Sequence, residues 1–335
     1  MVSKYDSGGG SEPGKPTVPF PGLGMSGRVR RLRPERPVKM ERSLFSEGTV
    51  EPKDIVANTS LQHIDLRFDV HDRVLWCQFR FNVRPCFTEA MLNDFVTVRR
   101  MLHRMFSVSP DEDPVRILAL SSPVQGVWNL GGDLDLFSTL IRTRNRERLL
   151  DYAIAAAEAG YHFTNSFGLP LLTVSLVQGD ALGGGFEAAL SGNVLIAERN
   201  AKFGFPEILF NLFPGMGAYS FLARRLSPGL AERMILSGNI LTAEQLYDMG
   251  VVDILAEDNG AVESLYDMMG PSGARLAAWK AVTDARRIVH PVRIEELHEI
   301  ARNWTELALT LTDSDLRRMA RLVSAQDKRA PGAHE

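Results

Sequence analysis

The sequence contains only two cysteines, Cys77 and Cys86, and this scarcity excludes several kinds of protein. Two thiols are too few for a disulfide framework or for a cysteine-rich metal cluster. We therefore interpret both as small, buried side chains. Nothing else in the sequence indicates a metal or a redox cofactor, and we expect the protein to use none.

Long apolar runs and a large net charge are also missing. No stretch approaches the roughly 18 consecutive apolar residues of a membrane span, and the first residues lack the basic-then-apolar pattern of a secretion signal. The 335 residues carry a net charge of −3, which implies no general attraction to nucleic acid or membrane surfaces. With 44% apolar residues, the chain is expected to be a cytoplasmic globular protein.

Large apolar residues are scarce near the N-terminus. Residues 1–42 hold six of the 18 prolines, seven of the 28 glycines and nine Lys/Arg against four Asp/Glu, a local charge of +5 (9 − 4). Such a composition cannot bury enough apolar surface to offset the entropy of ordering, so we predict a disordered basic tail over residues 1–54. We expect a folded core over 55–270, a helical region over 271–326 and a loose tail over 327–335.

Strands alternate with helices along the core. Residues 63–70 and 73–81 read as the two strands of a hairpin. Thr88 could cap the next helix, and a further helix is expected around 144–160. Short apolar strands, of which 171–177 is the clearest, lie between the helical segments. This alternation predicts an α/β layered fold.

Two glutamates stand in apolar, glycine- or proline-bearing segments twenty positions apart. Glu187 ends the segment Ala181-Leu-Gly-Gly-Gly-Phe-Glu187, and Glu207 ends Gly204-Phe-Pro-Glu207. Apolar surroundings raise the pKa of a carboxyl group, which lets it exchange protons near neutral pH. Two such carboxyls beside a glycine turn predict acid–base chemistry on a polarised carbonyl.

These segments, together with Leu130-Gly-Gly-Asp-Leu134 and Phe213-Pro-Gly-Met-Gly217, resemble the crotonase (enoyl-CoA hydratase/isomerase) superfamily. The resemblance covers about residues 60–330 and implies a crotonase-like ββα superhelix. It also implies a homotrimer, or another homo-oligomer, that assembles through the helices of the C-terminal region.

The resemblance assigns roles to the glutamates and to two glycine turns. Glu187 and Glu207 would be catalytic, and N–H groups of Leu130 (or its neighbour Gly131) and of Gly184 would form an oxyanion hole. Glycine lets the backbone approach the substrate closely, and each such donor can supply ~3 kcal/mol. We hypothesise that Glu207 removes the Cα proton of a 3-hydroxyacyl thioester while a protonated Glu187 assists departure of the Cβ hydroxyl.

A closer resemblance, carried by Gly179–Leu190, Leu209–Ser220 and Arg318–Gln326, is to the diffusible-signal-factor synthases of bacteria. It implies that a 3-hydroxyacyl group on acyl carrier protein is dehydrated and released as a cis-2-unsaturated fatty acid, a quorum-sensing signal. A sensor kinase would be a further partner. Asp135 stands where many CoA-using relatives carry a lysine, and a carboxylate there would repel the nucleotide phosphates of CoA.

Apolar residues flank both glutamates, and we predict that they line an acyl pocket, although packing in the core is a competing interpretation for each. They are Phe186, Phe205, Leu212, Phe213 and Met216. Two other interpretations of the whole chain stay open at this point. One is an ordinary enoyl-CoA hydratase or isomerase, and the other is a non-catalytic protein that binds a signalling partner.

Residues 141–148 carry four arginines in eight positions. Carrier proteins are usually acidic, so these arginines could form a docking patch, but the start of a solvated helix is the simpler interpretation.

Overall fold

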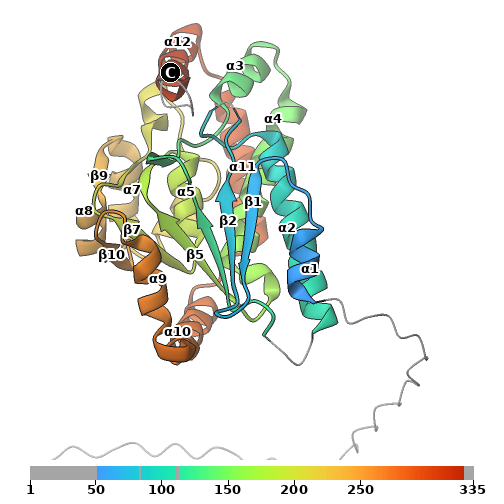
Figure 1. Cartoon of the computed structure of the whole chain (residues 1–335). Coiled ribbons are helices and arrows are strands. Elements are labelled where there is room, and N and C mark those ends of the chain that lie inside the picture. The colour runs from blue at the N-terminus through green and yellow to red at the C-terminus, as the bar shows by residue number, and fades with distance from the viewer. Residues whose placement is uncertain (1–50, 83, 110–112, 328–335) are drawn as a thin grey trace, which may run out of the picture. The chain divides into compact units, whose positions relative to one another are not determined.

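Strands in the middle of the chain come in consecutive pairs (β3 with β4, β5 with β6, β7 with β8), and each pair gives one strand to the larger and one to the smaller of two sheets (Figure 1). The structure is a computed structural model that describes residues 51–82, 84–109 and 113–327. The larger sheet contains, in spatial order, β1 (Ile64–Asp69), β2 (Val74–Phe79), β3 (Ile117–Ser121), β5 (Leu172–Val177), β7 (Val194–Glu198) and β10 (Ile254–Ala256). The smaller sheet contains β4 (Gly126–Asn129), β6 (Gly179–Leu182), β8 (Lys202–Gly204) and β9 (Ile240–Thr242).

The larger sheet explains why some strands alternate between apolar and polar residues in the sequence while others are continuous apolar runs. Strands β1 and β2 pair antiparallel, with Ile64 opposite Phe79, so the predicted hairpin is confirmed. The other neighbours in this sheet pair in parallel, and every residue of β3, β5 and β7 is buried. Parallel strands covered on both faces read as continuous apolar runs rather than as alternating ones. The predicted α/β fold class is confirmed.

Helices connect the strands and account for most of the remaining described residues. They are α1 (Pro52–Ala57), α2 (Glu89–Val108), α3 (Leu134–Arg142), α4 (Arg146–Thr164), α5 (Gly184–Ser191), α6 (Ala218–Leu222), α7 (Pro228–Ser237), α8 (Ala243–Asp248), α9 (Ala261–Met269), α10 (Leu276–Val289), α11 (Ile294–Ala308) and α12 (Asp313–Asp327), with 3-10 turns η1 (Ser166–Gly168), η2 (Pro206–Phe210) and η3 (Pro271–Gly273). The Thr88 hydroxyl accepts a hydrogen bond from the Met91 N–H, which confirms the predicted cap of α2.

Two expected boundaries can be compared with these elements. Helix α1 begins at Pro52, so ordered structure starts before residue 55, where the folded core was expected to begin. Proline suits the first turn of a helix because its missing N–H would have no partner there. The rest of the predicted basic tail, residues 1–50, and residues 328–335 lie outside the described part of the chain.

The C-terminal helices pack on the core of their own chain. Helix α11 lies against α4, and α12 lies against α3. The Trp304 ring of α11 meets the Phe137 ring of α3 edge-on, with 5.1 Å between ring centroids. Ion pairs join the same elements, since Arg146 contacts Glu306 and Arg142 contacts Asp313. Two of the four arginines between residues 141 and 148 therefore contact acidic side chains of the C-terminal helices, and assembly into an oligomer stays a prediction.

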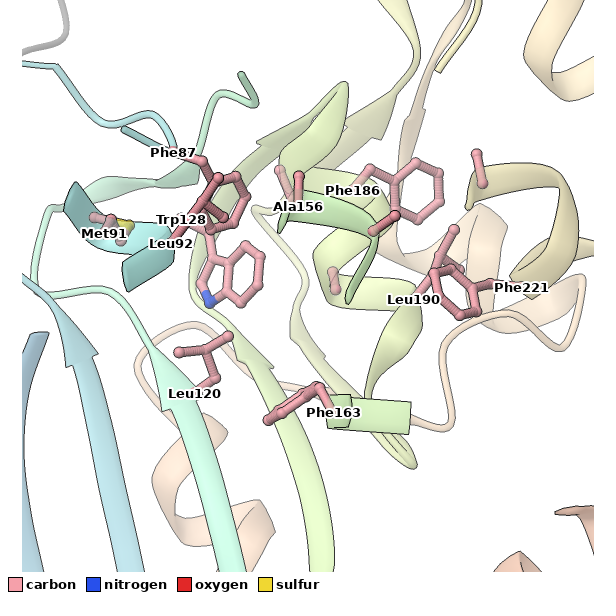
Figure 2. Close-up of a cluster of buried hydrophobic side chains, with 14 of the residues drawn as sticks. Phe87, Met91, Leu92, Leu120, Trp128, Ala156, Phe163, Phe186, Leu190 and Phe221 are labelled. Carbon is pink, nitrogen blue, oxygen red and sulfur yellow. The ribbon is translucent and has the colours of Figure 1, made fainter. Parts of the chain in front are cut away.

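A large apolar cluster fills the space between the larger sheet and helices α2, α4 and α5. Figure 2 shows Phe87, Leu120 and Trp128 facing Phe163 and Ala156 within it. Leu120 is 3% exposed and Trp128 is fully buried. This cluster adjoins helix α5, so the core directly supports the segment that carries Glu187. Within residues 51–327, as far as they are described, no helix is both long and apolar enough to cross a membrane.

Candidate active site

Glu187 lies in the first turn of α5 and is held in one orientation. The residue is 2% exposed, and its Oε1 accepts hydrogen bonds from the N–H groups of Met216 (2.7 Å) and Ala218 (2.9 Å). Burial raises the pKa of this carboxyl to about 7, although these backbone donors, which favour its ionised form, oppose the rise. Glu187 can therefore gain or lose a proton near neutral pH.

Glu207 lies in η2, directly after Pro206, and its carboxyl is less well supported. The residue as a whole is half-buried, but its Oε2 is enclosed and has no hydrogen-bond partner among the described residues. Burial and, second, the negative charge of Glu187 raise the pKa of Glu207 to about 8. The two carboxyls titrate as a pair. Three backbone N–H groups favour ionised Glu187 and one favours ionised Glu207, so a proton shared by the pair in the free protein resides mainly on Glu207.

The two carboxyls face a common cavity. Glu187, Glu207, Gly132, Gly184 and Met216 are among the residues that line this space, which we call the reaction cavity. A wider cleft shares Glu207 and both glycines with it. Lys202 and Leu322 also line this cleft. The structure thus brings together both predicted glutamates and both predicted glycine turns.

The glycine turns touch each other, and this contact requires glycine. Gly131 and Gly183 have φ values of +94° and +56°, which other residues rarely adopt. A Cβ on Gly131 would lie 2.9 Å from the Gly184 nitrogen, and a Cβ on Gly184 would lie 3.4 Å from the Gly132 nitrogen. The backbone N–H groups of residues 132 and 184 are therefore held close together.

The predicted oxyanion hole needs a correction. The Leu130 N–H donates to the Pro85 carbonyl (2.7 Å), and the Gly131 N–H donates to Oδ1 of Asn129 (2.8 Å). Both N–H groups already have acceptors, so neither is placed to stabilise an oxyanion. In the described part of the chain, the N–H groups of Gly132 and Gly184 have no such acceptor, and both glycines line the reaction cavity.

The position of Asn129 in the sequence could have predicted that the Gly131 N–H is already bonded. Asparagine side chains commonly accept a hydrogen bond from the backbone N–H two residues further along the chain. Asn129 precedes Gly131 by two positions and could have been expected to occupy its N–H. Gly132 therefore replaces Leu130 and Gly131 beside Gly184 as the candidate pair of donors.

The predicted acyl pocket also needs a correction. Phe186 and Phe205 are fully buried and stack on each other with 4.8 Å between ring centroids. Leu212 is 2% exposed, and Phe213 packs against the same core. Of the five predicted residues only Met216 lines the reaction cavity or the two cavities that adjoin it. Phe186, Phe205 and Leu212 instead pack in the core, as the competing interpretation had it.

Asp135 is not an isolated negative charge at this site. One of its carboxylate oxygens lies 2.9 Å from the Arg84 guanidinium, which also lies 4.0 Å from Asp133. Arg84 partly neutralises both carboxylates, so the expected repulsion of nucleotide phosphates is weaker than the sequence suggests.

Comparison with known proteins agrees with this geometry. The model of the enoyl-CoA hydratase/isomerase family matches residues 101–284. The chain is 42% identical over 94 residues to 2,3-dehydroadipyl-CoA hydratase of Escherichia coli, which covers 28% of this chain and 36% of that protein. It is 30% identical over 190 residues to mouse enoyl-CoA hydratase domain-containing protein 2, covering 55% of this chain and 58% of the relative. The chain thus spans well under two thirds of the length of these curated relatives.

A solved structure gives the same fold over most of the chain. The enoyl-CoA hydratase from Bacillus halodurans superposes with a TM-score of 0.63 over 78% of this chain and 100% of that one, at 18% sequence identity. Identity at that level shows the fold alone. The family model covers more than half of the chain, and the protein therefore belongs to the enoyl-CoA hydratase/isomerase family.

Proposed function

We propose that this protein dehydrates a 3-hydroxyacyl thioester and then hydrolyses the thioester, which releases a cis-2-unsaturated fatty acid that serves as a diffusible signal. The carrier would be acyl carrier protein rather than CoA. One observation carries the proposal. Two buried carboxyls with raised pKa values share a cavity with two closely spaced backbone N–H groups.

The dehydration step assigns one carboxyl to each carbon. Ionised Glu207 takes the Cα proton, and the enolate oxygen accepts hydrogen bonds from the N–H groups of Gly132 and Gly184. Protonated Glu187 then gives its proton to the Cβ hydroxyl, which leaves as water. After this step Glu207 carries the proton and Glu187 is ionised.

The second step begins from the protonation state in which the first one ends. Ionised Glu187 takes a proton from a water that attacks the thioester carbon, while the same two N–H groups hold the tetrahedral oxyanion. Protonated Glu207 gives its proton to the departing thiolate. The products are a free 2-enoic acid and the carrier thiol, and the pair returns to its starting state.

An ordinary enoyl-CoA hydratase is the second candidate, and a specific observation favours it. Addition of water to a 2-enoyl thioester needs ionised Glu187 to activate the water and protonated Glu207 to supply the Cα proton. This is the distribution that the hydrogen bonds favour in the free protein. Dehydration must begin with the proton on Glu187 and with Glu207 ionised, which is the less populated state of the pair. The pairing of Asp135 with Arg84 also weakens the argument against CoA.

Mass spectrometry of the products distinguishes the two candidates. The protein is incubated with 3-hydroxydodecanoyl-acyl carrier protein and, separately, with crotonyl-CoA, beside the Glu187→Ala and Glu207→Ala variants. Free 2-dodecenoic acid from the unchanged protein, and from neither variant, supports both steps. Enoyl-carrier without free acid limits the activity to dehydration. Turnover of crotonyl-CoA alone identifies an ordinary hydratase.

A further inference from the structure

Two backbone segments meet on the Gly132 side of the candidate oxyanion hole. One is the glycine turn of residues 130–132, and the other is residues 85–87, which we call the strap. The Phe87 N–H donates to the Gly131 carbonyl at 2.8 Å, and Phe87 pairs with Gly132 as an isolated parallel bridge. The strap therefore supports the backbone that carries the Gly132 N–H.

The hydroxyl of Tyr152 joins the strap to the turn at the same point. It donates to the Phe87 carbonyl at 2.6 Å and accepts from the Asp133 N–H at 3.4 Å. A Cβ on Gly132 would lie 3.6 Å from this hydroxyl oxygen. Tyr152 thus restrains Gly132 from its C-terminal side, whereas Asn129 restrains the turn from its N-terminal side.

Helix α4 carries Tyr152, and packing fixes the ring. The residue is 4% exposed, and its ring meets the Phe137 ring edge-on, with 4.8 Å between ring centroids. Both residues line the reaction cavity. A hydroxyl on a packed ring has little freedom to follow a movement of the turn, so its bonds restrain the backbone that presents the Gly132 N–H.

Two direct chemical roles for this hydroxyl conflict with its surroundings. Burial and, second, the neighbouring Cys86 raise the pKa of Tyr152 well above its ordinary value of 10, so the phenol keeps its proton near neutral pH. A phenol has one O–H to donate. Tyr152 gives it to the Phe87 carbonyl and therefore not to the oxygen of a thioester.

We infer that Tyr152 is a positioning residue for the oxyanion hole. Its hydroxyl holds the strap against the turn and thereby aims the Gly132 N–H at the substrate oxygen. The inference rests on the proposed function, because it concerns the same hole. Tyr152 acts on the polarisation of the thioester carbonyl rather than on binding of the substrate, so kcat depends on the hydroxyl more than KM does.

The absorption spectrum of a bound chromophoric thioester tests the inference without turnover. A 4-dimethylaminocinnamoyl thioester of pantetheine absorbs at longer wavelength when its carbonyl accepts stronger hydrogen bonds, so the red shift on binding measures the strength of the hole. Tyr152→Phe keeps the ring and removes the hydroxyl. We expect this variant to lose about half of the red shift and about tenfold in kcat, with KM unchanged.

Two further variants are the controls, and thermal melts establish that each protein is folded. Tyr161→Phe removes a hydroxyl from the same helix that has no hydrogen-bond partner in the described part of the chain and does not line the reaction cavity. It should keep the full red shift and kcat. Tyr152→4-aminophenylalanine keeps a donor to the Phe87 carbonyl and should restore most of both.

The outcomes separate this inference from the proposed function. A folded Tyr152→Phe that keeps the red shift and kcat overturns the inference, and so do equal losses in Tyr161→Phe. If Tyr152→Phe does not fold, a folded 4-aminophenylalanine variant that has lost the red shift overturns it instead. A thioester that binds the unchanged protein with no red shift contradicts the hole and the inference together. Absence of turnover in a protein that shows the shift contradicts the proposed function and leaves the role of Tyr152 standing.

Discussion

Gly183 lies directly against the carboxyl of Glu207, since a Cβ atom on Gly183 would come within 2.6 Å of Glu207 Oε1. The turn that positions the Gly184 N–H therefore also forms the wall on which the second carboxyl rests. A side chain at position 183 would therefore disturb both the oxyanion hole and the proton-transfer group.

Gly183→Ala is expected to reduce kcat at least a hundredfold. The added methyl group displaces Glu207, and a small misplacement of a catalytic group costs about that factor. The backbone strain of alanine at positive φ contributes about 1–3 kcal/mol of destabilisation. Gly168→Ala is the matched control, because Gly168 has a φ of +71° with no atom within 4 Å of its added Cβ. Steady-state kinetics and thermal melts of both variants should show similar losses of stability but a loss of activity only in Gly183→Ala.

Burial of Glu207 makes the stability of the protein depend on pH in a specific direction. Its pKa rises from an ordinary value of 4.5 to about 8, so between these values the folded state keeps a proton that the unfolded state has lost. The contribution of Glu207 to the free energy of unfolding therefore falls as pH rises from 4.5 to 8 and is constant above 8.

Glu207→Gln removes the group that titrates, and with it the fall in the free energy of unfolding between pH 4.5 and pH 8. Relative to the unchanged protein, the variant should gain stability progressively from pH 4.5 to pH 8, by an amount on the order of a few kcal/mol. Chemical denaturation at a series of pH values measures the difference. Glu295→Gln, at an exposed position of α11, is the control variant. A constant difference for Glu207→Gln would mean that its carboxyl is not protonated in the folded state at neutral pH.

The element pattern of the fold could be read from the sequence because each signal is local. Thr88 capped its helix through a bond to a residue three positions away, and the hairpin of β1 and β2 needed only alternation and a turn. The two glutamates could be paired because each stands in a short glycine- or proline-bearing motif.

The acyl pocket could not be read from the sequence, because an apolar residue beside a catalytic one has no defined direction. Successive helical residues point about 100° apart, so Phe186 turns into the core while Glu187 faces the cavity.

Asn129 is expected to act through the glycine turn rather than by touching the substrate. Asn129→Ala leaves the buried Gly131 N–H without its acceptor, which costs about 1–3 kcal/mol and loosens the turn that presents the Gly132 N–H. We expect kcat to fall about 10- to 100-fold with little change in KM. Asn145→Ala is the control, because Asn145 caps α4 through its bond to the Arg148 N–H, away from the site. Comparable kcat losses in the two variants would point to general destabilisation instead.

Asp135 provides a test of carrier preference. Asp135→Lys replaces a negative charge that is 61% exposed with a positive one beside Arg84. For acyl-CoA relative to acyl-pantetheine, kcat/KM should rise about two- to fivefold at low ionic strength, and the gain should vanish at high salt because exposed charges are screened. An equal effect on both substrates would show that position 135 does not face the nucleotide of CoA.

The central claim is that Glu207 exchanges the Cα proton while the N–H groups of Gly132 and Gly184 hold the enolate. The most direct test is deuterium uptake at Cα of a saturated acyl thioester, such as dodecanoyl-acyl carrier protein, in D₂O. This reaction needs the hole and the Cα base but no group at Cβ. The account predicts uptake with the unchanged protein and with Glu187→Gln, and none with Glu207→Gln. Uptake that persists in Glu207→Gln and disappears in Glu187→Gln would contradict it.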